Sequence, residues 1–154
     1  MPALVKLGVV ALALQAGAPP NDFAFRFDHK GCHCEYVDTF RGTYSHVGAP
    51  GPLPFALSDY HRQILFAGIL ESGFFDLPQV ASDVGTRDPA DTFELEVRMN
   101  GRFHTVTWTL NSERPFDRLE RFFVPLFRML EYHPDVLRLR RRGDGCAEGP
   151  PPVR

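Results

Sequence analysis

The dipeptide Asn100-Gly101 is the feature that most restricts how this chain can fold. Apolar and polar residues alternate on both sides of it, over residues 93–99 and 102–108. Asn-Gly favours the two-residue turn of a β-hairpin, and alternation is typical of a strand with one buried face. A turn of this length also fixes the register, so that Phe93 lies opposite Trp108. The sequence therefore predicts an antiparallel hairpin whose large apolar side chains share one face.

The other face of this hairpin is polar and is predicted to lie in solvent. It carries Glu94, Glu96, Arg98, Phe103, Thr105 and Thr107. Two carboxylates on an open strand face lack the cleft that acid–base catalysis needs, so they are not interpreted as a catalytic pair. We expect His104, on the apolar face, to be packed and hydrogen-bonded. The polar face is expected to be a contact surface.

The region before residue 55 predicts further strands. Residues 21–28 alternate, with Phe23, Phe25 and Phe27 on one face and Asp22, Arg26 and Asp28 on the other, which predicts a half-buried strand. Residues 34–40 and 43–47 predict two more strands, joined at Gly42. Residues 48–54 contain three prolines, which exclude a helix or a central strand there. This three-proline loop is a second expected contact surface.

Two amphipathic helices are predicted. Ser58 can cap a helix over 59–72, and Gly73 can end it. The residues expected to form its apolar stripe are Tyr60, Ile64, Ala67 and Leu70, with Leu65 and Ile69 beside them. Pro115 suits the start of a second helix, in which Pro125 is expected to cause a kink and which His133-Pro134 ends. Its expected stripe is Phe116, Leu119, Phe122, Phe123, Leu126, Phe127 and Leu130.

The order hairpin, helix, hairpin, helix predicts an α+β fold. The simplest arrangement is an antiparallel sheet of two hairpins plus an extra strand, with both helices packed on one face. We expect a single domain over 22–142, which is long enough to enclose one core. Most of the 14 phenylalanines fall on these apolar faces and are assigned to that core. Residues 136–142 fit a strand or a short helix, and the Gly- and Pro-rich residues 143–154 predict a disordered tail.

Residues 1–18 have the layout of a secretory signal peptide. Lys6 precedes an unbroken apolar run over 7–14, and Ala16-Gly17-Ala18 supplies small residues at a cleavage spacing. Pro19 is unfavourable directly after a cut, so the true site could lie a few residues away. The run is too short to span a bilayer, which predicts a periplasmic or secreted protein without a stable membrane anchor. The alternative is a buried N-terminal helix.

Charge and motifs exclude several classes of function. A formal net charge of −2 argues against binding to nucleic acid, which requires a strongly basic face. The sequence contains no Gly-x-Ser-x-Gly, no His-Glu-x-x-His and no glycine-rich phosphate loop. We therefore expect a protein that is not an enzyme and that needs no cofactor.

The sequence leaves the chemical role of one cluster of histidines and cysteines undecided. His29, Cys32, His33 and Cys34 lie close together, and His46 on a neighbouring strand could join them to bind zinc or copper. In an exported protein a disulfide is the stronger interpretation, with Cys146 reaching back to Cys32 or Cys34. Unpaired thiols are the third possibility. The mass of the protein with and without reductant, together with metal analysis, would separate the three.

Three segments carry a resemblance to known proteins. They are Cys32-His33-Cys34-Glu35-Tyr36, the helix that Leu57-Ser58 opens before residues 73–78, and the hairpin around Asn100-Gly101 with its proline-led helix. Over residues 22–132 the chain resembles a group of small exported bacterial domains of unknown function. That group usually has Cys-x-x-x-Cys where this chain has Cys-His-Cys. Residues 57–132 also resemble the emfourin family, which inhibits thermolysin-like metalloproteases.

The sequence thus supports two hypotheses about function. The first is an exported, non-enzymatic module that binds another exported protein, and a peptidase inhibitor is its most concrete form. The second is a metal-binding or redox-active periplasmic domain that uses Cys32, His33 and Cys34.

Overall fold

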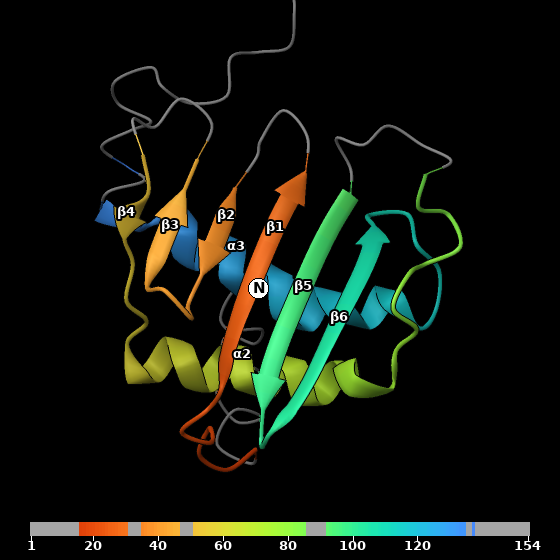
Figure 1. Cartoon of the computed structure of the whole chain (residues 1–154), viewed down its shortest axis with the longest axis horizontal. Coiled ribbons are helices and arrows are strands. Elements are labelled where there is room, and N and C mark those ends of the chain that lie inside the picture. The colour runs from red at the N-terminus through yellow and green to blue at the C-terminus, as the bar shows by residue number, and fades with distance from the viewer. Residues whose placement is uncertain (1–15, 31–34, 47–50, 86–91, 135–136, 138–154) are drawn as a thin grey trace, which may run out of the picture.

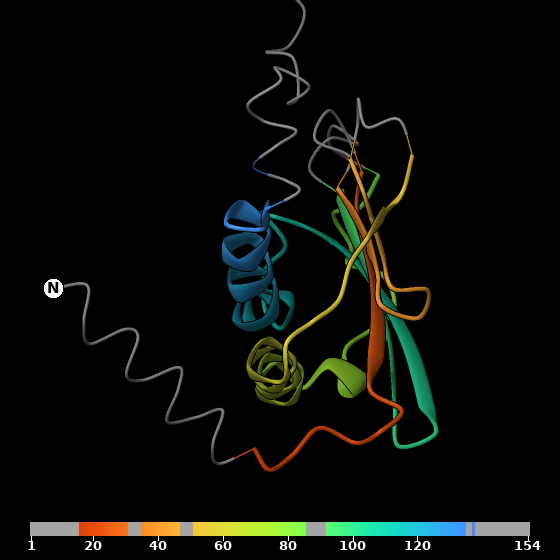
Figure 2. The same ribbon diagram turned by 90° about the vertical axis from the view of Figure 1, so that its left-hand side faces the viewer.

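The protein consists of a six-stranded antiparallel sheet with two helices on one face. The structure, a computed structural model, describes residues 16–30, 35–46, 51–85, 92–134 and 137. Seen edge-on, both helices lie on the same side of the sheet and its other face is open (Figure 2). This arrangement confirms the predicted α+β class.

The sheet has the strand order β4-β3-β2-β1-β5-β6, so the first strand lies in its interior (Figure 1). Along the chain the elements are β1 (Ala24–Lys30), β2 (Tyr36–Asp38), β3 (Thr43–Ser45), β4 (Leu53–Pro54), α2 (Asp59–Ser72), η1 (Phe74–Asp76), β5 (Thr92–Met99), β6 (Arg102–Thr109), η3 (Phe116–Leu119) and α3 (Glu120–Glu131). β1 pairs with β2 on one side and with β5 on the other, which joins the two predicted hairpins.

The β5–β6 hairpin has the predicted register. Phe93 lies opposite Trp108 and Val97 opposite His104. Asn100 and Gly101 both have positive φ angles, 52° and 70°, which is the conformation that a two-residue hairpin turn requires. Phe93 and Trp108 are buried on the face that the helices cover, so the turn places the apolar residues as expected.

Asp22 holds this turn against the start of β1. Its two carboxylate oxygens accept hydrogen bonds from the backbone N–H groups of Asn100 (2.9 Å) and Gly101 (2.8 Å). These two bonds hold the pKa of Asp22 below its ordinary value of 3.8, and the bond from Gly101 has the larger effect. A side chain before the first strand thereby connects two parts of the sheet that are distant in sequence.

The lowered pKa of Asp22 predicts a loss of stability in acid. The contribution is complete above about pH 3.8 and disappears as the pH falls through the lower pKa of the folded state. Asp22→Ala should lower the thermal midpoint at pH 7, and the difference from the wild type should shrink towards pH 2. Thermal unfolding between pH 2 and 7 measures this difference, and exposed Asp76 provides the matched Asp→Ala control. If the difference in thermal midpoint between Asp22→Ala and the wild type did not change with pH, the charged form of Asp22 would not be the form that stabilises the turn.

The bounds of the first helix were predicted correctly, but its apolar stripe was only partly correct. α2 covers Asp59–Ser72, the Ser58 side chain accepts from the His61 N–H, and Gly73 ends the helix with a φ of 63°. However, Tyr60 is 57% exposed and Leu70 is 44% exposed. The side chains of α2 in the core cluster are Leu65, Phe66 and Ile69. Of the predicted stripe, Leu65, Ala67 and Ile69 are buried. Tyr60 and Leu70 are exposed because α2 has two apolar faces and only one of them covers the sheet.

α2 and α3 touch at a glycine. A Cβ on Gly68 would lie 2.9 Å from the carbonyl carbon of Arg121 and closer still to its oxygen. Pro125 lies inside α3 and has no N–H, so the carbonyl of Arg121 lacks its usual donor one turn later. Because Gly68 has no Cβ, the backbone of α3 can approach α2 closely at this carbonyl. The sequence pair Gly68 and Pro125 thereby sets how closely the helices approach.

The phenylalanines form the core as predicted. Phe93 has an exposed fraction of 1% and lies at the centre of an aromatic cluster between the sheet and α3. Its neighbours within 6.4 Å between ring centres are Phe27, His29, Trp108, Phe123 and Phe127. Phe103, on the open face of the sheet, is 60% exposed.

Some local features differ from expectation. The end of the three-proline loop forms the edge strand β4. Val80, between η1 and β5, forms a parallel bridge with Thr107. Residues 134 and 137 are helical, while the rest of 136–142, most of the predicted signal peptide and the predicted tail lie outside the described residues. Among the described residues, no helix is both long and apolar enough to cross a bilayer.

Candidate functional site

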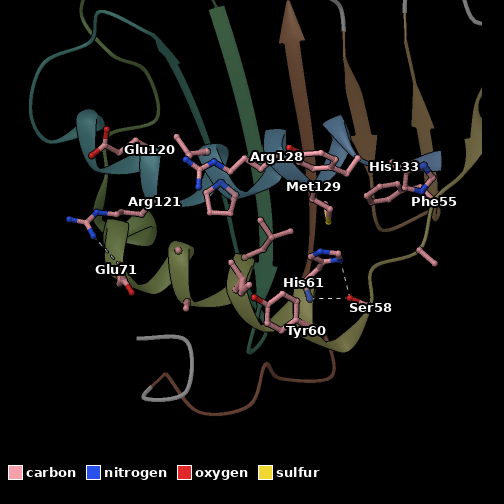
Figure 3. A pocket seen from close by; sticks show the side chains of 18 of the residues that line it. Phe55, Ser58, Tyr60, His61, Glu71, Glu120, Arg121, Arg128, Met129 and His133 are labelled. Atoms are coloured by element: carbon pink, nitrogen blue, oxygen red, sulfur yellow. Dashed lines mark hydrogen bonds and ion pairs between the residues drawn. The ribbon is translucent and has the colours of Figure 1, made fainter. Parts of the chain in front are cut away.

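A groove lies between α2 and α3 on the side of the helices that faces away from the sheet. It has a volume of about 900 Å³. One wall carries Tyr60, Ile64 and Ala67 from α2, and the other carries Val124, Pro125 and Met129 from α3 (Figure 3). These walls are apolar, and a concave apolar surface of this size is typical of a binding site.

The groove is apolar because α2 has a second apolar face, which does not cover the sheet. Tyr60 and Ile64 belong to the stripe that sequence analysis assigned to the core, but they line the groove instead. The helices are in close contact at Gly68 and Arg121. They diverge towards the N-terminal end of α2 and the C-terminal end of α3 (Figure 1). We call the end of the groove at the Gly68 contact the narrow end, and the end at Tyr60 and Tyr132 the wide end.

Two tyrosines lie at the wide end of the groove. Tyr60 is 57% exposed and Tyr132, directly after α3, is 74% exposed. Phe55 also lines the groove at this end, and its ring centre is 5.4 Å from that of His133. Exposed tyrosines beside an apolar hollow are a common composition of protein interfaces, because the ring adds apolar contact area and the hydroxyl remains solvated.

The charges along the groove are only partly paired. At the narrow end Arg121 forms an ion pair with Glu71 at 3.7 Å. Glu120 and Arg128 also line the groove and are exposed, and neither has an ion-pair partner among the described residues. The rim thus presents one uncompensated carboxylate and one uncompensated guanidinium on the same helix.

The predicted metal-binding residues fall at one end of the sheet. His29 is near the end of β1, and its backbone N–H donates to the carbonyl of Glu35, just before β2. Continuing the register by one residue places His46 beside Glu35 on the other side. The ring of His29 stacks on Phe93 at 4.5 Å, so this row faces the helices. Glu35 is 7% exposed.

The other predicted metal ligands, Cys32, His33 and Cys34, lie outside the described residues, as does Cys146, the predicted disulfide partner of Cys32 or Cys34. Within the described part of the chain, no group of three or more His, Cys, Asp or Glu side chains is placed to hold a metal ion. His29 and His46 therefore share a face and an end of the sheet without forming a metal site by themselves.

The open face of the sheet carries pairs of opposite charge. Arg26 forms an ion pair with Glu96, and Lys30 forms one with Glu94 at 3.3 Å. Both glutamates were expected on this face, and their charges are matched by neighbouring cations. Asp28 lies directly opposite Glu94. Burial raises the pKa of Asp28, and the negative charge of Glu94 adds to this while Lys30 and Arg26 oppose it.

The raised pKa of Asp28 predicts that its charge costs stability at neutral pH. Stability should rise as the pH falls through the raised pKa of the folded state towards 3.8. Asp28→Asn should therefore increase the thermal midpoint at pH 7, and the gain should disappear below about pH 3.8. Thermal unfolding of both proteins at several pH values measures this, and an equal or lower midpoint at pH 7 would contradict it.

His104 is packed as expected. Its Nε2 is 2.8 Å from the carbonyl oxygen of Leu77, and its ring lies 5.4 Å from that of Phe74. What sequence analysis missed is the groove. The available signal was the width of the α2 apolar surface, since Ile64 and Ala67 cannot face the sheet together with Phe66 and Ile69.

Comparison with known proteins gives no match: no protein family, no curated protein and no solved structure is significantly similar to this chain.

Proposed function

We propose that this protein is an exported, non-enzymatic domain that binds another protein through the groove between α2 and α3. The observation that carries the proposal is the groove itself, with apolar walls and two exposed tyrosines at its wide end. Export is proposed from the layout of residues 1–18. The groove replaces the open sheet face as the proposed contact surface, because the charges of that face are largely paired with one another.

Two exposed side chains allow this proposal to be tested without disturbing the core. The double variant Tyr60→Ala/Tyr132→Ala should lose a partner that the wild type and Phe103→Ala retain in affinity capture from exported proteins. The purified partner should then bind the wild type in a fixed stoichiometry, with a loss of affinity of about tenfold or more for the double variant. A partner that binds all three proteins equally would contradict the role of the groove.

The most concrete form of the proposal is a peptidase inhibitor. It is supported by the resemblance of residues 57–132 to the emfourin family. A thermolysin-type enzyme assayed with the full chain should be slowed at micromolar concentrations of the protein. Unchanged hydrolysis at these concentrations would reject the inhibitor and leave protein binding through the groove to be judged by the tyrosine variants.

The alternative proposal is a metal-binding or redox-active domain that uses Cys32, His33 and Cys34. Its support is that His29 and His46 lie at the end of the sheet that flanks residues 31–34. Elemental analysis should find metal in the wild type and not in Cys34→Ser. A mass two protons lower before reduction, without metal, would instead assign a disulfide.

A further inference from the structure

The dimensions of the groove match a short helix. The wall on α2 extends from Tyr60 to Glu71, about 16 Å at 1.5 Å per residue, and the wall on α3 has a similar length. Three turns of a helix cover this distance. The volume of about 900 Å³ accommodates several side chains of leucine size rather than one. A third helix in this position would lie across the outer side of α2 and α3, away from the sheet.

The walls favour a helix over an extended peptide. A peptide that adds to a sheet gains affinity from main-chain hydrogen bonds to an unpaired strand edge. The walls here are α2 and α3, whose backbone groups are bonded within each helix apart from isolated exceptions such as the carbonyl of Arg121. That carbonyl is covered by Gly68. Binding in this groove must therefore depend on the burial of apolar side chains.

Two charged side chains of α3 indicate which charges an occupant of the groove carries beside its apolar contacts. Glu120 and Arg128 are eight residues apart on α3, about 12 Å along its axis. Glu120 lies towards the narrow end of the groove and Arg128 towards the wide end (Figure 3). Since neither has an ion-pair partner in the described part of the chain, an occupant gains from a cation near the first and an anion near the second.

We propose that the groove takes an amphipathic helix of about three turns from the partner protein. The helix places an apolar stripe against Ile64, Val124 and Met129. It carries a basic side chain near Glu120 and an acidic side chain near Arg128. This inference rests on the proposed function, because it identifies the part of the partner that the groove holds.

Synthetic helical peptides of about 15 residues test the proposal with the full chain, since shorter helices are marginal in water. Three peptides share one leucine stripe and differ at two positions that are eight residues apart. These positions are Lys and Glu in the mixed peptide, Lys and Lys in the second peptide, and Glu and Glu in the third. The mixed peptide should bind about three- to tenfold more tightly than the others, measured by fluorescence anisotropy. Because the mixed peptide satisfies both charges in one of its two directions, the result does not depend on helix polarity.

The variant Arg128→Glu supplies the decisive comparison. It makes both charges of the groove negative, so the preference should move from the mixed peptide to the Lys and Lys peptide. Arg118→Glu changes the charge equally on η3, outside the groove, and should leave the preference unchanged. Circular dichroism of each variant checks that the fold is retained.

Several results would contradict the proposal that the groove binds a helix. Equal binding of the three peptides, or a preference unaffected by Arg128→Glu, would show that the rim charges do not select the occupant. Dissociation of a dimer by Tyr60→Ala/Tyr132→Ala would assign the groove to a second copy of this chain. If a captured partner needs the two tyrosines but is indifferent to Arg128→Glu, protein binding through the groove stands and the helical occupant is rejected.

Discussion

Replacement of Phe93 by alanine should remove about 3–5 kcal/mol from the free energy of unfolding. The ring is 1% exposed and packs between Trp108 at 5.4 Å, Phe27 at 5.9 Å and Phe123 at 6.1 Å. Its removal leaves a cavity where β1, β5, β6 and α3 meet, and rigid neighbouring rings cannot easily fill it. A loss of this size is a large part of the stability of a domain of this length.

Urea denaturation followed by circular dichroism measures this loss. Phe103→Ala is the matched control, because it makes the same exchange on the adjacent strand at a side chain that is 60% exposed. It should cost less than about 1 kcal/mol. Similar losses for the two variants would show that Phe93 is not at the centre of the core.

Gly68→Ala should destabilise the protein by about 1–3 kcal/mol, although alanine is the better helix former. In an exposed helix the same exchange gains about 1 kcal/mol. Here the added Cβ would meet the backbone of Arg121, with 2.9 Å to its carbonyl carbon, and a backbone cannot rotate away as a side chain can. The two helices must therefore separate.

The sign of the change distinguishes this explanation from helix propensity. Leu70→Ala, at a 44% exposed position of the same helix, should have a much smaller effect. Unfolding of both variants in urea measures the two effects. A more stable Gly68→Ala protein would mean that α2 and α3 do not approach each other so closely in solution. Because the same contact forms the narrow end of the groove, the variant should also weaken the binding of the mixed peptide.

Local signals in the sequence determined the elements. Asn100-Gly101 set the β5–β6 register because a two-residue turn permits only one pairing. Ser58 and Gly73 set the bounds of α2 because each satisfies backbone groups that the helix leaves free. The alternating Phe23, Phe25 and Phe27 identified a strand with one buried face, and the order of elements was enough for the fold class.

The short strands were less accessible to such reasoning. β2, β3 and β4 have two or three residues each, and their limits depend on where neighbouring strands end. The parallel bridge of Val80 to Thr107 and the bonds of Asp22 to the hairpin turn join residues far apart in sequence. A polar residue in a loop gives no local indication of the distant backbone group that it will bind.

By itself, the sequence determined which segments are strands and helices, where the hairpin turns, and which phenylalanines are buried, because these depend on periodicity and on residues with restricted backbone angles. The tertiary structure decided which of the two apolar faces of α2 meets the sheet. It also decided that β1 joins the two hairpins and that a groove remains beside Gly68. These outcomes depend on how complete elements pack, and a helix with two apolar faces does not specify by itself which one another element will cover.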